Sequence, residues 1–526
     1  MQIFSFSPFG YEGSLVSVEV DLRRGIPAVD IVGLADGAVK ESRERMRSAI
    51  RNCGYEFPPE RVLISLSPAD VKKEGAGFDL AIALAVLKAK EDVDYFLEKP
   101  GPSSVLVMGE LELNGKVRPV RGINAAVNTA YEKGISHCIV PAGNGDEARE
   151  VRGMKVFEAT NLCEAFRALL EPDTYCQNRE DTEDESKCLP DGACHIGGVY
   201  FPQESPGMEY AEIKNQGKLV RALSIAAAGG HNLLAFGPPG CGKSLALQKF
   251  QTLLPLLGKE ETVPVTRIYS IAGLLPSDQR LMRVPPFRQP HQTASIEGMC
   301  GGGIHCSPGE ISLAHNGVLF LDEGAEFRSS VLQMLRVPLE SGLITISRAG
   351  RSTVYPAHFQ LLIATNPCPC GFYGARDKIC LCSAHSIEQY WRKFSGPLLD
   401  RIDLRVQVDI PSVNDKGKNE EEKTLSTLEL RKKIAVAVKA QRERQNKKNA
   451  SLTPQEVQEF CTCSSSASGI LSSATEKYGF SPRAVSSCLK TARTVADMGG
   501  SSLIQEEHMM EAVMYRSVDG GLGSGT

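Results

Sequence analysis

The residues with the clearest chemical role lie in one glycine-rich segment, residues 232–247, which reads NLLAFGPPGCGKSLAL. The apolar run at its start is typical of a buried strand, and a helical pattern follows its glycines. Glycines between a strand and a helix let consecutive backbone N–H groups converge on a phosphate, and the helix N-terminus adds its positive dipole end. The phosphate cradle that this pattern predicts consists of Gly237, Pro238, Pro239, Gly240, Cys241, Gly242, Lys243 and Ser244.

Two of these residues define the ligand. Lys243 is placed to reach the β- and γ-phosphates of a nucleoside triphosphate, and the Ser244 hydroxyl is placed to bind Mg²⁺. We therefore favour ATP with Mg²⁺ as the ligand over a glycine turn of purely structural role.

A pair of acids follows the apolar run GVLFL at residues 317–321. A buried parallel strand of this kind delivers its terminal carboxylates to the carboxyl edge of a sheet. We expect Asp322 to hold Mg²⁺ and Glu323 to orient and partly deprotonate the attacking water. Together with the phosphate cradle, the pair predicts hydrolysis of the nucleotide.

Three further polar residues are candidates for the same reaction. Asn366 ends a third apolar strand, residues 359–365, where an amide can contact the γ-phosphate or the lytic water. Arg401, in SGPLLDRID, suits an arginine finger offered to the nucleotide of a neighbouring subunit. Arg483, near the start of a later helical pattern, suits a second sensor of the nucleotide. The alternative for both arginines is an ordinary surface ion pair.

A predicted β-hairpin, residues 343–355, carries Arg348 and Arg351 on either side of its Ala-Gly turn. Two cations at an exposed tip suit contact with DNA phosphates, which dominate non-specific affinity. The alternative is a solvated hairpin with charges at its turn.

Four cysteines lie close together in the sequence: Cys368, Cys370, Cys380 and Cys382. Four thiolates match structural zinc, although the Cys-x-Cys spacing is tighter than the usual two-residue gap. Reduced thiols in a surface loop are the alternative. A second group, Cys176, Cys188, Cys194 and His195, has no common metal-site spacing, and we interpret it as thiols without a metal.

Composition restricts the setting. The 526 residues are 42% hydrophobic and 23% charged, with a formal net charge of −4, so any contact with nucleic acid requires a local basic surface. The N-terminus lacks the pattern of a signal peptide, and no apolar run is long enough for a membrane span. Sixteen cysteines in this context fit a reducing cytoplasm better than a disulfide framework.

The predicted fold class is α/β with several domains. Residues 1–170 have the alternation of a compact α/β unit, and residues 171–205 have the acidic, polar composition of a linker. We expect a parallel-sheet nucleotide-hydrolysing core at 206–410, a helical lid at 411–520 and a disordered tail at 521–526. In the lid we expect a solvated face formed by Arg431, Lys432, Lys439, Arg442 and Arg444.

Residues 1–170 resemble the proteolytic domain of Lon and the related domain of RadA-type recombination proteins. The matching segments are EGAG at residues 74–77 and GELELNGKVRPVRGINAA at residues 109–126. Where Lon has a Ser nucleophile and an activating Lys, this chain has Gly75 and Asn124. The resemblance therefore implies a Lon-like domain without peptidase activity.

The chain as a whole resembles magnesium-chelatase-like AAA+ ATPases of the ComM (YifB) group. The resemblance rests on the phosphate loop, FRQPHQTAS, PGEISLAHNGVLFLDE, LESGLITISRA, NPCPCG and SGPLLDRIDL, in that order. It implies a hexameric ring that acts on DNA as a branch-migration helicase in natural transformation and recombination, alongside other recombination proteins. Two alternatives are a chelatase motor that drives Mg²⁺ into a porphyrin and a non-hydrolysing protein whose nucleotide controls assembly.

Overall fold

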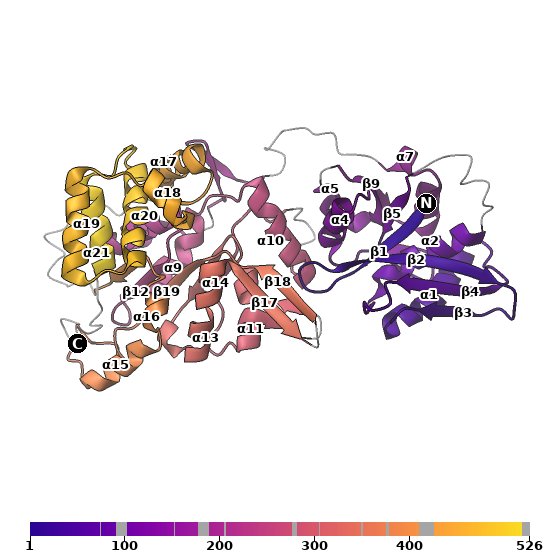
Figure 1. The fold of residues 1–526 in the computed structure, drawn as a ribbon, viewed down its shortest axis with the longest axis horizontal. Helices are drawn as coiled ribbons and strands as arrows, with labels where there is room; N and C mark the ends of the chain where they lie inside the picture. Colours follow the sequence, from indigo (N-terminus) through magenta and orange to yellow (C-terminus); the bar gives the residue numbers. More distant parts are fainter. Residues whose placement is uncertain are drawn as a thin grey trace.

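The structure is a computed structural model of the chain. It describes residues 1–73, 75–90, 102–151, 153–176, 189–204, 207–275, 281–303, 306–348, 351–374, 378–409 and 425–517. The predicted tail, residues 521–526, and Cys188 lie outside these ranges. Two lobes are visible in Figure 1, with α10 (Lys259–Ala272) on the side of the larger lobe that faces the smaller one.

The N-terminal lobe is built on a seven-stranded mixed sheet with the order β3-β4-β2-β1-β5-β8-β9. Helix α2 (Asp79–Lys90) is buried from Asp79 to Leu87, which explains why its apolar residues show no single face. The strands of this sheet are β1 (Gln2–Ser7), β2 (Ser14–Arg23), β3 (Val29–Val32), β4 (Arg61–Ser67), β5 (Ser104–Val107), β8 (His137–Pro141) and β9 (Lys155–Ala159). The other elements of the lobe are α1 (Gly37–Asn52), β6 (Glu110–Leu111), β7 (Val117–Arg118), α4 (Ile123–Glu132), α5 (Gly145–Arg149), α6 (Leu162–Leu170) and α7 (Pro172–Tyr175).

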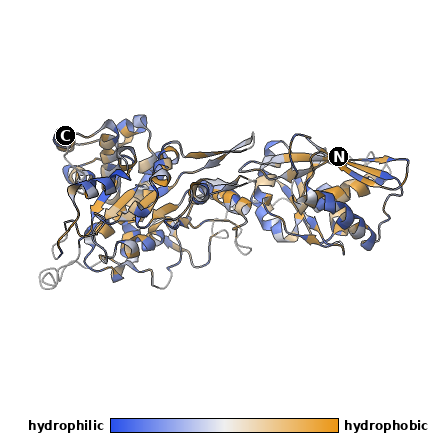
Figure 2. Ribbon diagram, turned by 90° about the horizontal axis from the view of Figure 1, so that it is seen from below, coloured by the Kyte–Doolittle hydropathy of each residue, from blue (hydrophilic) through white to orange (hydrophobic). Residues whose placement is uncertain are grey.

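The second lobe is built on a five-stranded parallel sheet with the order β13-β16-β19-β12-β20. Its central strands are apolar throughout because helices cover both faces, and the hydrophobic residues concentrate there in Figure 2. The strands are β12 (Leu233–Phe236), β13 (Phe287–Arg288), β16 (Val318–Leu321), β19 (Gln360–Thr365) and β20 (Leu404–Gln407). The surrounding elements are α8 (Gly217–Gly229), α9 (Lys243–Gln248), α11 (Ile296–Cys300), β14 (Gly301–Gly302), β15 (Ser307–Pro308), α12 (Glu310–Leu313), α13 (Ser329–Met334), α14 (Arg336–Ser341), β17 (Leu343–Arg348), β18 (Arg351–Pro356), α15 (Ala384–Arg392) and α16 (Gly396–Leu399).

The C-terminal region is helical, as predicted. It consists of α17 (Thr427–Gln445), α18 (Pro454–Phe460), α19 (Ser465–Tyr478), α20 (Pro482–Met498) and α21 (Glu506–Ser517). In the described part of the chain, every helix is too short or too polar to span a bilayer.

Two arginines of α17 differ from the predicted solvated face. The Arg431 side chain is 1% exposed and donates to Thr252 O at 2.8 Å. The Arg444 side chain is paired with Asp497, whose side chain is 2% exposed. These two cations pack inward because acceptors on neighbouring elements meet them, a feature that helical periodicity alone does not reveal.

Parts of the predicted linker are also ordered into the fold. Cys176 is buried, and the strands β10 (Cys194–Ile196) and β11 (Val199–Phe201) form a hairpin. Val199 and Phe201 are 1% and 0% exposed and belong to the core of the second lobe. The composition of residues 171–205 thus predicts a linker, whereas the structure has a packed hairpin in the last part of this segment.

Candidate nucleotide-binding site

Three chain segments meet at the carboxyl edge of the parallel sheet. The phosphate loop follows β12, Asn366 follows β19, and Asp322 follows β16, and these three strands are direct neighbours. Their registers pair Phe236 with Thr365 and Leu321 with Ile363, so the three strand ends lie at nearly the same level. This is the place where open α/β sheets bind their ligands.

The phosphate loop curls around its own lysine. The Lys243 side chain is buried, and its Nζ donates to Gly237 O at 2.7 Å and to Pro238 O at 2.9 Å. Gly240 and Gly242 have φ values of 79° and 84°, which side chains disfavour. The glycines thus allow the loop to fold around its lysine, whose ammonium group is held by two carbonyl oxygens of the loop.

A direct hydrogen bond joins the phosphate-loop segment to the acid that follows β16. Ser244 Oγ donates to Asp322 Oδ1 at 2.8 Å. Hydroxyl and carboxylate oxygens are the ligands that Mg²⁺ prefers, so this pair fits the metal that accompanies a triphosphate. Bound there, Mg²⁺ would neutralise charge on the phosphates.

Glu323 has the backbone conformation expected of a functional residue. Its φ is 50°, in the left-handed region that a glutamate rarely adopts, and its N–H donates to Asp322 Oδ1 at 3.1 Å. Backbone conformations of this kind persist where the surroundings enforce them, and they cluster at active sites. The Glu323 side chain is exposed and free to meet a water at the sheet edge.

The two predicted arginines meet on one carboxylate, that of Glu340 at the end of α14. Arg483 donates to Glu340 Oε1 at 2.7 Å, and Arg401 is bonded to Glu340 Oε2. These hydrogen bonds from Arg483 and Arg401 lower the pKa of Glu340. The Arg401 side chain is only 9% exposed, against 46% for Arg483. Sequence reasoning did not single out Glu340, since one glutamate on a short helix carries no distinguishing signal.

This arginine pair lies on the side of the sheet opposite to the phosphate loop. Arg401 O accepts a hydrogen bond of 2.8 Å from Asn232 Nδ2, and Asn232 directly precedes β12. Ser487, one turn after Arg483 on α20, donates to Asp403 at the start of β20. Since four residues of strand span roughly 13 Å, the arginines at the amino edge of the sheet are separated from the phosphate loop of their own chain by about the length of a strand.

The predicted hairpin is present as β17 and β18. Arg348 and Arg351 form its last backbone pair, while their side chains and the Ala349-Gly350 tip lie outside the described residues. The N-terminal lobe contacts strand β18 of the hairpin, because Tyr11 N donates to Thr353 Oγ1 at 3.0 Å. The Tyr11 and Tyr355 rings also pack edge to face at 5.7 Å.

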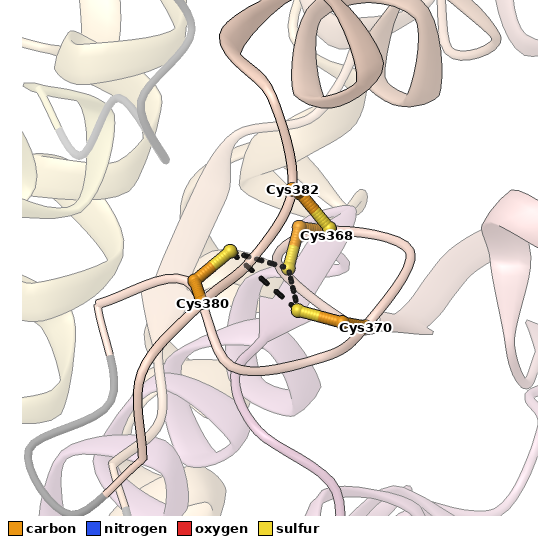
Figure 3. Close-up of side chains that lie close together, drawn as sticks. All are labelled: Cys368, Cys370, Cys380 and Cys382. Carbon is orange, nitrogen blue, oxygen red and sulfur yellow. Dashed lines mark hydrogen bonds between the residues drawn. The ribbon is translucent and has the colours of Figure 1, made fainter.

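The four cysteines converge in space. The sulfur atoms of Cys368, Cys370, Cys380 and Cys382 all lie within 4.8 Å of one another. Figure 3 shows the four side chains gathered in one place. Within the described ranges, no further group of three or more histidines, cysteines and acids is placed for a metal.

Asn124, which stands where the resemblance to Lon predicts a catalytic lysine, is buried in the N-terminal lobe. Asn124 is 1% exposed, and its Oδ1 accepts a hydrogen bond of 2.9 Å from Asn128. Gly75 has no side chain to act as a nucleophile. Both positions therefore lack the Ser and Lys of the Lon catalytic pair.

Comparison with known proteins shows which family the chain belongs to. Family models described as "Magnesium chelatase, subunit ChlI", "Subunit ChlI of Mg-chelatase" and "Magnesium chelatase, subunit ChlI C-terminal" match residues 209–416, 18–144 and 424–516. The chain is 38% identical to YifB of Escherichia coli over 510 residues, 97% of this chain and 96% of that protein. It is 35% identical to the competence protein ComM of Haemophilus influenzae over 525 residues, 98% of this chain and 97% of ComM. The chain belongs to the ComM/YifB family of magnesium-chelatase-like proteins.

A shorter sequence match is to a DNA repair protein. The DNA repair protein RadA of Haemophilus influenzae is 29% identical over 119 residues, 23% of this chain and 24% of RadA. The resemblance to the ComM/YifB family inferred from the motifs is thus confirmed over nearly the full length. The mixed α/β architecture, with its parallel sheet and helical C-terminal region, agrees with an AAA+ fold of the magnesium-chelatase type.

Proposed function

We propose that this chain is an ATP-dependent DNA motor that works as a hexameric ring in the cytoplasm. The proposal that the chain hydrolyses ATP rests on the hydrogen bond between Ser244 and Asp322, which joins the phosphate loop to the acids at one edge of the sheet. Lys243 would bind the phosphates, and Ser244 and Asp322 would hold Mg²⁺. Glu323 would accept a proton from the water that attacks the γ-phosphate, and Asn366 would hold that water or the γ-phosphate in place.

The separation of the arginine pair from its own phosphate loop supports assembly. Arg401 and Arg483 are bonded to Glu340 on the amino side of the sheet. A cation stabilises transition-state charge only when it reaches the transferred phosphoryl group. A ring in which this side of one subunit faces the phosphate loop of the next subunit would bring the pair to the reaction.

DNA as the substrate rests on the hairpin and on the relatives. Arg348 and Arg351 pair at the end of a hairpin that contacts the N-terminal lobe through Thr353. Cations at such a position suit the phosphates of a strand passing through a ring. ComM is named for competence and RadA for DNA repair. We propose branch migration during transformation and recombination as the specific activity, in company with other recombination proteins.

The test is ATP hydrolysis by the full chain with single-stranded, duplex and four-way-junction DNA, combined with the mass of the complex in the presence of ATP. We expect a hexamer whose hydrolysis rises most with the junction. Absence of hydrolysis under every condition would contradict the motor. A hydrolysis rate that no DNA changes, but that rises with a porphyrin and Mg²⁺, would favour the alternative of a chelatase motor. The name of the matching family supports this alternative.

A further inference from the structure

The four-cysteine cluster has distances that a single metal ion explains. The Sγ atoms of Cys368 and Cys370 are 3.3 Å apart, those of Cys370 and Cys380 are 3.5 Å apart, and those of Cys368 and Cys380 are 3.7 Å apart. Thiolates bound to one zinc ion at about 2.3 Å in a tetrahedron lie about 3.8 Å from one another. The first Cys-x-Cys pair, tight as its spacing is, therefore has its thiols at nearly the required separation, and the Cys380 thiol lies at a similar distance from both.

A disulfide and an iron–sulfur cluster both fit these distances less well than zinc. A disulfide needs sulfur atoms about 2.05 Å apart. An iron–sulfur cluster distributes its four cysteines over two or more iron atoms, so sulfurs bound to different irons would lie farther apart than the 4.8 Å within which all four lie here. Zinc with four thiolate ligands has no open position, which is the arrangement of a structural site.

The segment that carries two of the ligands is poorly held by burial. Ile379 and Leu381, which flank Cys380, are 85% and 90% exposed. Burial of apolar side chains therefore contributes little to fixing this part of the loop. In contrast, the Cys368 sulfur is buried and accepts a hydrogen bond of 3.3 Å from Tyr373 N, the kind of partner that orients a ligand atom.

The cluster lies directly beside the nucleotide site. The loop begins after Asn366, and a Cβ atom added to Gly371 would lie 2.8 Å from Cδ of Pro239 in the phosphate loop. The loop ends at α15, whose Trp391 donates to Pro367 O at 3.0 Å. Trp391 also packs edge to face on Phe236, the last residue before the phosphate loop, at 5.6 Å.

We propose that Cys368, Cys370, Cys380 and Cys382 bind one structural zinc ion, and that this ion holds the loop after Asn366 against Pro239. The zinc fixes the relative position of Asn366 and the phosphate loop, so loss of the metal slows hydrolysis more than it weakens nucleotide binding. The coupling rests on the ATPase activity proposed above, whereas the metal content does not.

The metal content is measured on the full chain, purified without added metal, by elemental analysis. We expect one zinc per chain, and about none in the double variant Cys380→Ser/Cys382→Ser. Cys463→Ser, a half-buried cysteine of the C-terminal region, is the matched control and should keep its zinc. Protein in which cobalt replaces zinc should show the intense thiolate-to-cobalt bands of a tetrahedral tetrathiolate site. A wild-type chain that holds and takes up neither zinc nor cobalt, or that holds an iron–sulfur cluster, would overturn the site.

The coupling is measured by nucleotide affinity and hydrolysis rate. Zinc is removed from the wild type with a thiol-reactive mercurial and a chelator, and is then restored after reduction. Because the wild type is used, a loss of hydrolysis that recovers with zinc does not come from misfolding of a variant. We expect hydrolysis to fall at least tenfold and to recover with zinc, while nucleotide affinity changes less than threefold. Unchanged hydrolysis after complete zinc loss would overturn the coupling. A zinc-loaded chain that never hydrolyses ATP would instead contradict the proposed function and leave the metal site standing.

Discussion

Arg401 and Arg483 are bonded to opposite oxygens of the Glu340 carboxylate, although 81 intervening residues separate them in the sequence. The length of strand β12 lies between this pair and the phosphate loop of the same chain, since Arg401 O accepts from Asn232 before β12. The pair is thus a unit that a neighbouring subunit can use. Glu340 holds the two guanidinium groups together before they meet a phosphate.

The first prediction is complementation between defective subunits. Lys243→Ala and Arg401→Ala should each lower hydrolysis by about 10³-fold or more, because each removes charge stabilisation from every site. Mixed rings of the two variants should regain activity. The intact phosphate loop of one subunit then faces the intact arginine of the other. Hydrolysis measured across mixing ratios gives the result.

The control for complementation is a mixture of Lys243→Ala with Glu323→Gln. Both defects lie on the phosphate-loop side of one chain, so no complete site forms in that mixture. Equal failure of both mixtures would show that Arg401 does not act on the neighbouring subunit.

The second prediction separates nucleotide binding from hydrolysis. Glu323→Gln removes the proton acceptor but keeps the shape of the side chain, so ATP affinity should stay within a few-fold of wild type. Turnover should fall by at least the roughly 10²- to 10⁴-fold that general base catalysis contributes. Binding is measured with a fluorescent nucleotide and turnover by phosphate release. Normal turnover would remove Glu323 from the reaction.

The third prediction concerns the hairpin. The double variant Arg348→Ala/Arg351→Ala should weaken DNA binding, and the slope of log affinity against log salt should become shallower by about 2, since two phosphate contacts are lost. Arg392→Ala is the matched control, because Arg392 is 69% exposed and paired with Glu388 on α15. An unchanged affinity and salt slope in the double variant would rule the hairpin out.

The sequence alone identifies the candidate nucleotide site because its signals are local. Strand, glycine loop and helix follow one another within residues 232–247, and the acids follow their own strand directly. Contacts between distant segments are a different matter. The pairing of Arg401 with Glu340 and the inward packing of Arg431 depend on which elements become neighbours, and a residue's own sequence context does not contain that information.

The last prediction is a dependence of stability on pH that originates in a buried histidine. Burial, with smaller effects from His358 and Lys448, lowers the pKa of His315 from 6.5 to about 3. Neutral His315 accepts a hydrogen bond of 3.1 Å from His358 N. Below pH 6.5 the unfolded chain binds a proton at this residue and the folded chain does not. Folding is therefore destabilised as the pH falls toward 3, by up to about 1.4 kcal/mol per pH unit.

Between pH 6.5 and 5, His315 should thus account for roughly 2 kcal/mol of lost stability. His315→Gln keeps an acceptor for the N–H but does not titrate, so its unfolding midpoint should fall less than that of wild type over this range. His385→Gln changes an exposed histidine on α15 and should behave as wild type. Thermal unfolding at the two pH values measures the difference. An equal fall in His315→Gln and wild type would mean that His315 is already protonated in the folded protein, or that its surroundings open before the chain unfolds.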